Sequence, residues 1–221
     1  MQHAEEIQKH LDILRALQVP SGLFLAAAEP GVSTGYDKSW LRDNFYEVLA
    51  FQEMEEWDTV AAVWHALLDI FIKHEDKIRY AAEEERPRFT YQYIHARYHP
   101  ETFEEFWEEW GNKQNDAVGA TLYAVGTLEQ SGHSVMRDEN DKRIVQRLVD
   151  YLASIEYYKD PDNGVWEEYE ELHASSVGAC VAGLIAVREA GLANVPEELL
   201  QNGQESLRVC LPRESYTKFT D

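Results

Sequence analysis

The run VAAVWHALLDIF, residues 60–71, decides the fold class of this 221-residue chain. Its apolar residues recur at intervals of three and four, which is the spacing of the buried face of a helix. The same spacing returns in almost every other segment, whereas the alternating pattern of strands is hard to find. We therefore expect an all-α protein with no sheet of consequence.

Proline and glycine interrupt this periodicity, because proline cannot continue a helix and glycine weakens one. The seven expected helices cover residues 3–18, 40–55, 58–75, 114–130, 139–157, 173–190 and 196–210. Short strands are considered only at 23–28 and 88–93. Neither a linker nor an internal repeat is visible, so we expect residues 1–221 to form one architectural unit. Residues 211–221 resemble a loop that leads to another element, and the simplest interpretation is the first part of a longer domain.

The composition is strongly acidic, with 41 Asp and Glu against 20 Lys and Arg and a formal charge of -21. Such a surface repels the phosphates of nucleic acids and gains nothing from an anionic membrane, so neither is an expected partner. Neutral sugars fit better, because they need hydrogen-bond acceptors and aromatic faces, and the chain has 12 tyrosines and 6 tryptophans. No signal peptide and no membrane span are visible, so we expect a cytoplasmic protein.

Metal and thiol chemistry find little support in the sequence. Cys180 and Cys210 belong to no metal-binding or disulfide pattern and are expected to be reduced and buried. His95 and His99 have the spacing of a metal-binding pair on a helix, but a proline follows them and a third ligand is missing. We expect neither a metal nor a cofactor.

Residues 172–178, LHASSVG, begin an expected helix that Ser175 and Ser176 would most simply cap. The glycine-flanked elbow of a serine nucleophile does not surround them, and phosphate-binding loops are absent from the sequence. Neither a serine hydrolase nor a nucleotide-binding protein is therefore indicated.

The clearest indication of chemistry is the run DNGVWEE at residues 162–168. Asn163 and Gly164 predict a turn, because both tolerate positive φ. The turn would hold Trp166 and Glu167 at the mouth of a helical scaffold, where the indole removes water from the carboxyl group and raises its pKa. Such a carboxyl group can protonate a leaving oxygen, as the general acid of a glycosidase does. The alternative is that the indole fills a gap in the core and that both glutamates are solvated.

The run WLRDN at residues 40–44 opens another expected helix. Here Asp43 could accept a hydrogen bond from a ligand hydroxyl while the guanidinium of Arg42 holds that hydroxyl in place. The alternative is that Asp43 caps the helix and that Arg42 is exposed. Trp40 in the same turn favours a site.

The run FEEFWEEW at residues 103–110 mixes aromatic faces with acceptors, as a sugar subsite does. Its aromatic residues also recur at i, i+3, i+4 and i+7, so packing of a helix against the core is the preferred interpretation for most of them. Trp110 is the exception, because it precedes a glycine turn and the polar Gln114 and Asp116.

Taken in order, four runs resemble glycoside hydrolase family 15, the glucoamylase group, which also includes the related domain of the phosphorylase kinase α and β regulatory subunits. These runs are WLRDN (40–44), WGNKQND (110–116), GVWE (164–167) and LHASSVG (172–178). The runs NDA (115–117) and LPRES (211–215) look especially like the phosphorylase kinase branch. The resemblance spans about residues 20–221.

The resemblance implies an (α/α)6 toroid of paired helices, of which the expected helices would form about the first half. It also implies hydrolysis of an α-glucosidic bond at a non-reducing end with inversion. By motif, Glu167 matches the general acid, and Arg42 with Asp43 matches the pair that grips the terminal glucose. Glu168 matches a neighbouring substrate contact, although the kinase branch does not keep a carboxylate there. The full set of expected substrate contacts is Trp40, Arg42, Asp43, Trp110, Gln114, Asp116, Trp166 and Glu168.

The general base of the family lies in the second half of the toroid, so no position of this chain matches it. Inversion requires two carboxyl groups about 6.5–9.5 Å apart, and we therefore do not expect this chain alone to turn over. The leading hypothesis is the N-terminal part of a family 15-like glycosidase that acts on an α-glucan or α-glucoside oligosaccharide.

Two other hypotheses stay open. The first is a regulatory or glucan-sensing module of the phosphorylase kinase type, which binds a sugar or a partner without hydrolysing it. The second is an orphan fragment without a function. A half-toroid would expose an apolar edge, so self-association through that edge is also expected.

Overall fold

The computed structural model describes residues 2–27, 35–106, 111–167, 169–210 and 219–220. The chain divides into two compact units. Unit 1 contains Met1–Ile70 and Arg97–Trp107, and unit 2 contains Phe71–Ala96 and Glu108–Asp221. The expectation that residues 1–221 belong to one domain stays a prediction.

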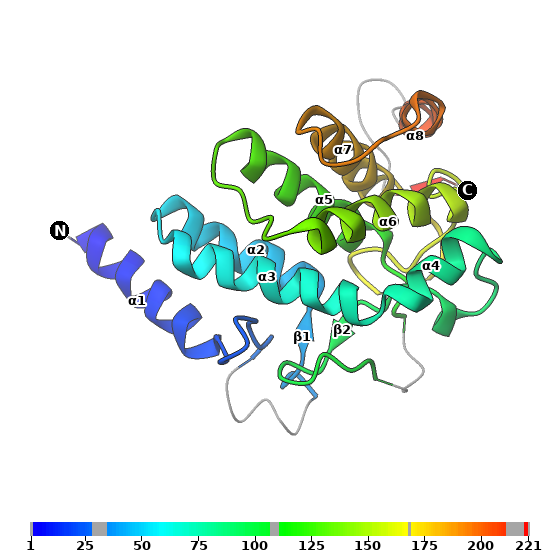
Figure 1. Ribbon diagram of the computed structural model, residues 1–221. Helices are drawn as coiled ribbons and strands as arrows, with labels where there is room; N and C mark the ends of the chain where they lie inside the picture. The colour runs from blue at the N-terminus through cyan, green and yellow to red at the C-terminus, as the bar shows by residue number, and fades with distance from the viewer. Residues whose placement is uncertain (1, 28–34, 107–110, 168, 211–218, 221) are drawn as a thin grey trace. The chain divides into compact units, whose positions relative to one another are not determined.

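Eight α-helices account for most of the described residues (Figure 1). They are α1 (Gln2–Leu17), α2 (Leu41–Glu53), α3 (Trp57–Lys73), α4 (Glu75–Glu83), α5 (Asn115–Gln130), α6 (Glu139–Ile155), α7 (Ala174–Glu189) and α8 (Glu197–Val209). The strands have two residues each and form two antiparallel pairs. These are β1 (Ser39–Trp40) with β2 (Arg97–Tyr98), and β3 (Leu172–His173) with β4 (Phe219–Thr220).

The expected all-α class is confirmed, and each of the seven expected helices matches an observed one to within two residues at either end. The sequence analysis missed α4 as a separate helix. His74, immediately before α4, has φ -99 and ψ 17, which leaves the α-helical region. No proline or glycine marks this break, so the periodicity alone could not reveal it.

Neither of the two short strands considered from the sequence is present in the described residues. Residues 88–93 form no strand, because Thr90–Gln92 is a 3-10 turn in which Gln92 Oε1 accepts from the backbone N–H groups of Arg88 and Phe89 at 2.8 and 2.9 Å. At 23–28, the described part shows only an isolated bridge between Phe24 and Gln18.

The helix expected from the aromatic stripe at 103–110 is absent from the described part of that segment, residues 103–106. Phe103 has φ 60, and Glu105 forms a bridge with Tyr98. Phe106 lies under the ammonium group of Lys38, with 4.3 Å between Nζ and the ring centroid. Its ring therefore serves a cation–π contact rather than a helix stripe.

In unit 1, Asn44 joins the start of α2 to the segments before it. Its side chain is fully buried. Its Oδ1 accepts from the N–H of Phe24 at 2.8 Å, and its Nδ2 donates to Ser39 Oγ at 2.7 Å and to the carbonyl of Trp40 at 2.8 Å. Because every group is buried and paired, Asn44 fixes the direction in which α2 leaves β1.

In unit 2, α5 and α7 approach each other until their backbones touch. A Cβ added at Gly119 of α5 would lie 2.4 Å from the backbone of Ala179, and one added at Gly183 of α7 would lie 2.3 Å from the carbonyl oxygen of Gly119. Further along, Gly126 has the same relation to Ala186. Because the contacts advance along both helices together, α5 and α7 run in the same direction and their N-terminal ends lie together (Figure 1).

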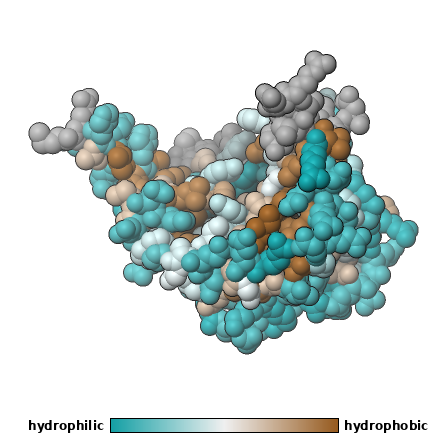
Figure 2. Space-filling model, turned by 90° about the horizontal axis from the view of Figure 1, so that it is seen from above, coloured by the Kyte–Doolittle hydropathy of each residue, from teal (hydrophilic) through white to brown (hydrophobic). Residues whose placement is uncertain are grey.

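The remaining helices of unit 2 add apolar cover. α6 packs against α4, and α8 packs against α7. One face of α6 is fully buried and carries Ile144, Val145, Leu148, Val149, Leu152 and Ile155. On the outside, Figure 2 shows mostly hydrophilic residues on the face that it displays, interrupted by hydrophobic ones. None of the helices in the described residues is long and apolar enough to cross a bilayer.

The glycine contact gives a first prediction. Gly119→Ala should lower the free energy of unfolding by about 1–3 kcal/mol or more, because the new methyl group would overlap the backbone of α7. Gly178→Ala is the matched control on α7, since the nearest atom to its Cβ is 3.9 Å away. The control should be neutral or gain up to about 1 kcal/mol of helix propensity. Urea unfolding followed by circular dichroism measures both, and equal stability of the two variants would refute the close contact.

Candidate functional site

The turn that carries Glu167 lies in unit 2, between α6 and α7. Gly164 has φ 60 and Glu167 has φ 55, so the expected turn is confirmed. A Cβ at Gly164 would lie 2.7 Å from the ring of buried His173, so the turn packs directly onto β3. The indole of Trp166 is 69% exposed, which excludes the alternative that it fills the core. Glu167 itself is partly buried.

Gln114 contacts the carboxyl group of Glu167. Gln114 is the residue immediately before α5 and is 4% exposed. Its Nε2 donates to Glu167 Oε1 at 3.2 Å and to the carbonyl of Gly111 at 3.2 Å. The structure therefore brings together two residues that the sequence analysis assigned to one site, and Gln114 fixes the orientation of the carboxyl group.

The neighbours of Gln114 hold the start of the same loop. The carbonyl of Lys113 accepts from the N–H of Asn163 at 2.8 Å. The N–H of Asn115 donates to Asp162 Oδ2 at 2.8 Å. Three consecutive residues before and at the start of α5 thus bind three positions of the loop, which fixes the register between the two segments.

A buried ion pair supports this register. The Nζ of Lys113 lies 2.9 Å from Asp160 Oδ2, and both side chains are 6% exposed. The same Nζ lies 4.1 Å from the centroid of the Tyr93 ring, and the hydroxyl of Tyr93 donates to Asp160 Oδ1 at 3.3 Å. Burial, and then the charge of Asp160, raises the pKa of Tyr93 above its usual value, so the hydroxyl remains a donor. The sequence analysis did not find this cluster, because its members are far apart along the chain.

Asp162 is fully buried beside the N-terminal ends of α5 and α7. Burial, and then the charge of Asp116, raises the pKa of Asp162 to about 7, against the hydrogen bonds from Asn115 and Ser176. The hydroxyl of Ser176 donates to Asp162 Oδ1 at 3.0 Å. The expectation that Ser176 caps α7 was therefore wrong, since the residue before α7 is His173 and the serine hydroxyl points to another loop.

The second cluster of expected site residues lies in unit 1, at the start of α2. Trp40 and Arg42 are buried, with 7% and 8% exposure, so the alternative of an exposed arginine is wrong. The residue before α2 is Trp40, and Asp43 lies in the first turn instead of at the cap. Burial raises the pKa of Asp43, and the charge of Arg42 opposes this shift. The guanidinium of Arg97 lies 5.6 Å from the centroid of the Trp40 ring, so a cation–π contact holds this indole.

Glu47 belongs to the same face of α2, one turn after Asp43, and the sequence analysis missed it. Burial, and then the charge of Asp43, raises the pKa of Glu47 to about 8. Its Oε2 is shielded from solvent and has no hydrogen-bond partner within the described parts of the chain. The i, i+4 spacing of Asp43 and Glu47, which places two acids on one face of α2, was the signal that could have found it.

The expected site residues thus fall into two groups. Trp40, Arg42 and Asp43 belong to unit 1, whereas Gln114, Asp116, Trp166 and Glu167 belong to unit 2. Asp116 is 7% exposed in the first turn of α5. Trp110 and Glu168 lie outside the described residues.

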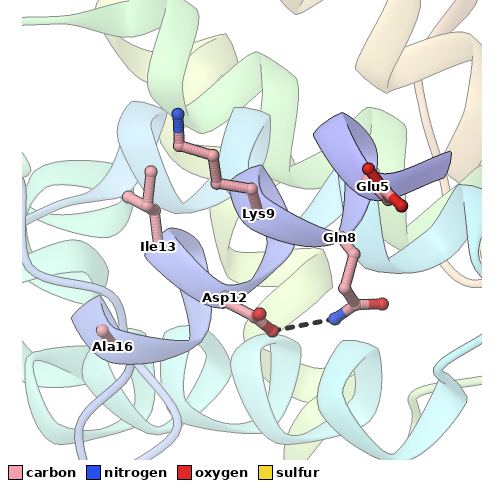
Figure 3. A pocket seen from close by; sticks show the side chains of 6 residues that line it. All are labelled: Glu5, Gln8, Lys9, Asp12, Ile13 and Ala16. Carbon is pink, nitrogen blue, oxygen red and sulfur yellow. Dashed lines mark hydrogen bonds between the residues drawn. The ribbon is translucent and has the colours of Figure 1, made fainter. Parts of the chain in front are cut away.

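The hollow along α1, the possible metal ligands and the cysteines add no residue to the candidate site. A shallow hollow of about 570 Å³ lies along α1 and is lined by Glu5, Gln8, Lys9, Asp12, Ile13 and Ala16, none of them an expected site residue (Figure 3). Within the described ranges, no group of three or more His, Cys, Asp or Glu could hold a metal ion. Cys180 and Cys210 are buried, as expected, and neither forms a disulfide within the described residues.

Comparison with solved structures shows that the chain has a helical fold of the kind found in glycosidases. A protein described as a wild-type glycosidase has a TM-score of 0.77 at 18% identity, over 97% of this chain and 59% of that one. The glucoamylase of Hormoconis resinae has a TM-score of 0.61 at 15% identity, over 99% of this chain and 39% of that one. At such identities the likeness shows the fold alone, and it confirms the expected glucoamylase-type (α/α)6 toroid, represented by about half of the barrel.

The particular family follows from the sequence match. Residues 8–212 match the model of glycosyl hydrolases family 15, and the chain belongs to this family. The phosphorylase b kinase regulatory subunit alpha, skeletal muscle isoform, of Oryctolagus cuniculus is 28% identical in an aligned stretch of 227 residues. The match covers 84% of this chain. The probable subunit alpha of Caenorhabditis elegans is 25% identical over 220 residues, which cover 83% of this chain. The chain spans 18% of the length of each of these relatives.

The raised pKa of Glu47 gives a prediction about stability. An unfolded chain loses the Glu47 proton near pH 4.5, whereas the folded chain keeps it until about pH 8, so the free energy of unfolding falls as the pH rises between these values. Glu47→Gln removes the titrating group and with it this fall in the free energy of unfolding. The stability of Glu47→Gln relative to the wild type should therefore rise from pH 4.5 to pH 8 and then level off.

Urea unfolding at several pH values measures this difference. Glu53→Gln is the matched control, because Glu53 is an exposed residue at the end of the same helix. A stability difference for Glu47→Gln that is as flat with pH as that of the control would contradict the raised pKa.

Proposed function

We propose that this chain is the N-terminal part of an inverting, exo-acting α-glucosidase of the glucoamylase type. The observation that carries the proposal is the arrangement of Glu167. It lies on a tight turn beside an exposed indole, and the amide of Gln114 holds its carboxyl group. An exposed indole offers a face on which a sugar ring can stack, and a held carboxyl group beside it can protonate the glycosidic oxygen.

The substrate in this proposal is an α-glucan or α-glucoside oligosaccharide. One solved structure of the similar glycosidase is described as a complex with glucose. A strongly acidic protein has no general attraction for anionic ligands, so a neutral sugar agrees with the charge of -21.

Each unit by itself contains groups suited to a sugar. In unit 1, the buried guanidinium of Arg42 donates to a hydroxyl, and Asp43 accepts from one. In unit 2, Glu167 acts as the general acid, while Asp116 and Trp166 contact the sugar. In the proposal, the general base comes from sequence beyond this chain, in keeping with the family resemblance.

The test is the effect of Glu167→Gln on the full-length protein that contains this chain. The glutamine keeps the shape of the side chain and can still bind Gln114, but it cannot transfer a proton. Release of glucose from maltose and maltotriose should fall by about 10²- to 10⁴-fold, which is the usual contribution of a general acid. Glu170→Gln, an exposed neighbour in the same loop, is the matched control and should retain activity. Full activity of Glu167→Gln would refute the assignment, and β-glucose as the first product would establish inversion.

A second function has a specific observation in its favour. The relatives named above are regulatory subunits of phosphorylase b kinase. In this alternative the chain binds a sugar or a partner without hydrolysing it. Binding of maltose measured by calorimetry, together with no glucose release from a full-length protein that has an intact Glu167, would favour the regulatory module over the enzyme.

A further inference from the structure

We propose that Asp162 is a positioning residue that holds the loop of Glu167 in place by joining it to α5 and α7. The importance of this loop rests on the proposed function of Glu167. The inference itself concerns the order of the loop, and it can be tested without substrate.

The geometry of Asp162 closes the loop at its base. Its backbone exchanges two hydrogen bonds with Glu171, both at 2.9 Å, so the segment that carries Glu167 is tied at both ends. Its side chain is fully buried and accepts from the N–H of Asn115 at 2.8 Å and from the hydroxyl of Ser176 at 3.0 Å. One residue thus connects the two arms of the loop, the start of α5 and the first turn of α7.

Both contacts require a side chain of this length with two terminal polar atoms, of which the one facing Asn115 must be an acceptor. Because α5 and α7 are parallel, their N-terminal ends present a backbone N–H and a serine hydroxyl to the same point. An alanine at 162 would leave both donors buried without an acceptor. An asparagine would keep both contacts, because its oxygen accepts from Asn115 while its amide group donates to Ser176 Oγ.

Several charged and titratable groups surround this carboxyl group. On α5, the charge of Asp116 raises the pKa of Asp162, and before α5 the charge of Lys113 lowers it. On α7, burial keeps the pKa of the Cys180 thiol well above its usual value, so this neighbour remains neutral. From β3, His173 packs against Gly164 in the same loop. Since the pKa of Asp162 is about 7, its carboxyl group changes between the neutral and the ionised form near neutral pH.

The protonation state changes the direction of one hydrogen bond. Ionised Asp162 accepts from both Asn115 and Ser176. Neutral Asp162 accepts from Asn115 and donates to Ser176 Oγ, so the serine hydroxyl must turn. Asp162→Asn therefore imitates the neutral form and removes the titration, whereas Asp162→Ala removes both contacts.

The experiment compares hydrogen exchange in the wild type, Asp162→Ala, Asp162→Asn and the control Glu170→Gln. In Asp162→Ala, amide exchange in residues 163–167 and 169–171 should increase by about 10- to 100-fold, which corresponds to the loss of about one hydrogen bond to a charged group. The interior amides of α5 and α7 should keep their protection. Asp162→Asn and the control should protect the loop as the wild type does.

A spectroscopic measurement separates a specific role from a merely structural one. The fluorescence of Trp166, obtained by subtracting the spectrum of Trp166→Phe, should change with a midpoint near pH 7 in the wild type and in Glu170→Gln. It should be constant with pH in Asp162→Asn. A response that persists in Asp162→Asn would belong to another group and would overturn the role of the Asp162 proton.

Ser176→Ala provides the second test, which remains valid if Asp162→Ala does not fold. This variant removes only the contact with α7 and should increase exchange of the loop amides by a smaller factor than Asp162→Ala. Unchanged loop exchange in Ser176→Ala, or in a folded Asp162→Ala, would overturn the proposal. Because no substrate is involved, these outcomes are independent of the activity of Glu167→Gln.

Discussion

The contact between α5 and α7 through glycine is the constraint on which the site of unit 2 depends. Gly119 and Gly183 remove the side chains that would keep two helices about 8–10 Å apart. The backbones touch, the helices run in parallel, and their N-terminal ends meet. Asp162 can reach donors on both helices only because those ends are so close. The loop that carries Glu167 therefore takes its position from backbone packing beyond the site itself.

A buried ion pair also helps to hold the loop of Glu167 against the start of α5. The pair of Lys113 and Asp160 costs desolvation energy, and such a pair adds little net stability compared with apolar residues of the same volume. Its value lies in specificity, since removing one partner would leave an uncompensated buried charge at a cost of about 3–5 kcal/mol. The ion pair therefore supports the register in which the carbonyl of Lys113 accepts from the N–H of Asn163. Such a device is expected where a carboxyl group must be held in one orientation.

Local signals in the sequence were sufficient for most of the fold and for part of the site. The periodicity of residues 60–71 predicted α3, and the pair Asn163 and Gly164 predicted the turn of Glu167, because both depend on near neighbours in the chain. The prediction failed where the deciding partner is remote or the backbone is unusual. Ser176 was interpreted as a cap because its partner, Asp162, lies 14 residues earlier. The positive φ of Phe103 keeps the first residue of the aromatic run out of a helix, and the described residues 103–106 are not helical.

The formal charge of -21 counts every carboxyl group as ionised, and the described residues include two carboxyl groups whose pKa lies near or above neutral pH. Glu47 has a pKa of about 8 and Asp162 a pKa of about 7, so both hold a proton for part of the time at neutral pH. In each case burial is the main cause and a neighbouring aspartate is the second, with Asp43 beside Glu47 and Asp116 beside Asp162. A protonated carboxyl group both donates and accepts a hydrogen bond, as a sugar hydroxyl does. Each unit thus contains an acidic pair in which burial keeps one carboxyl group partly protonated near neutral pH.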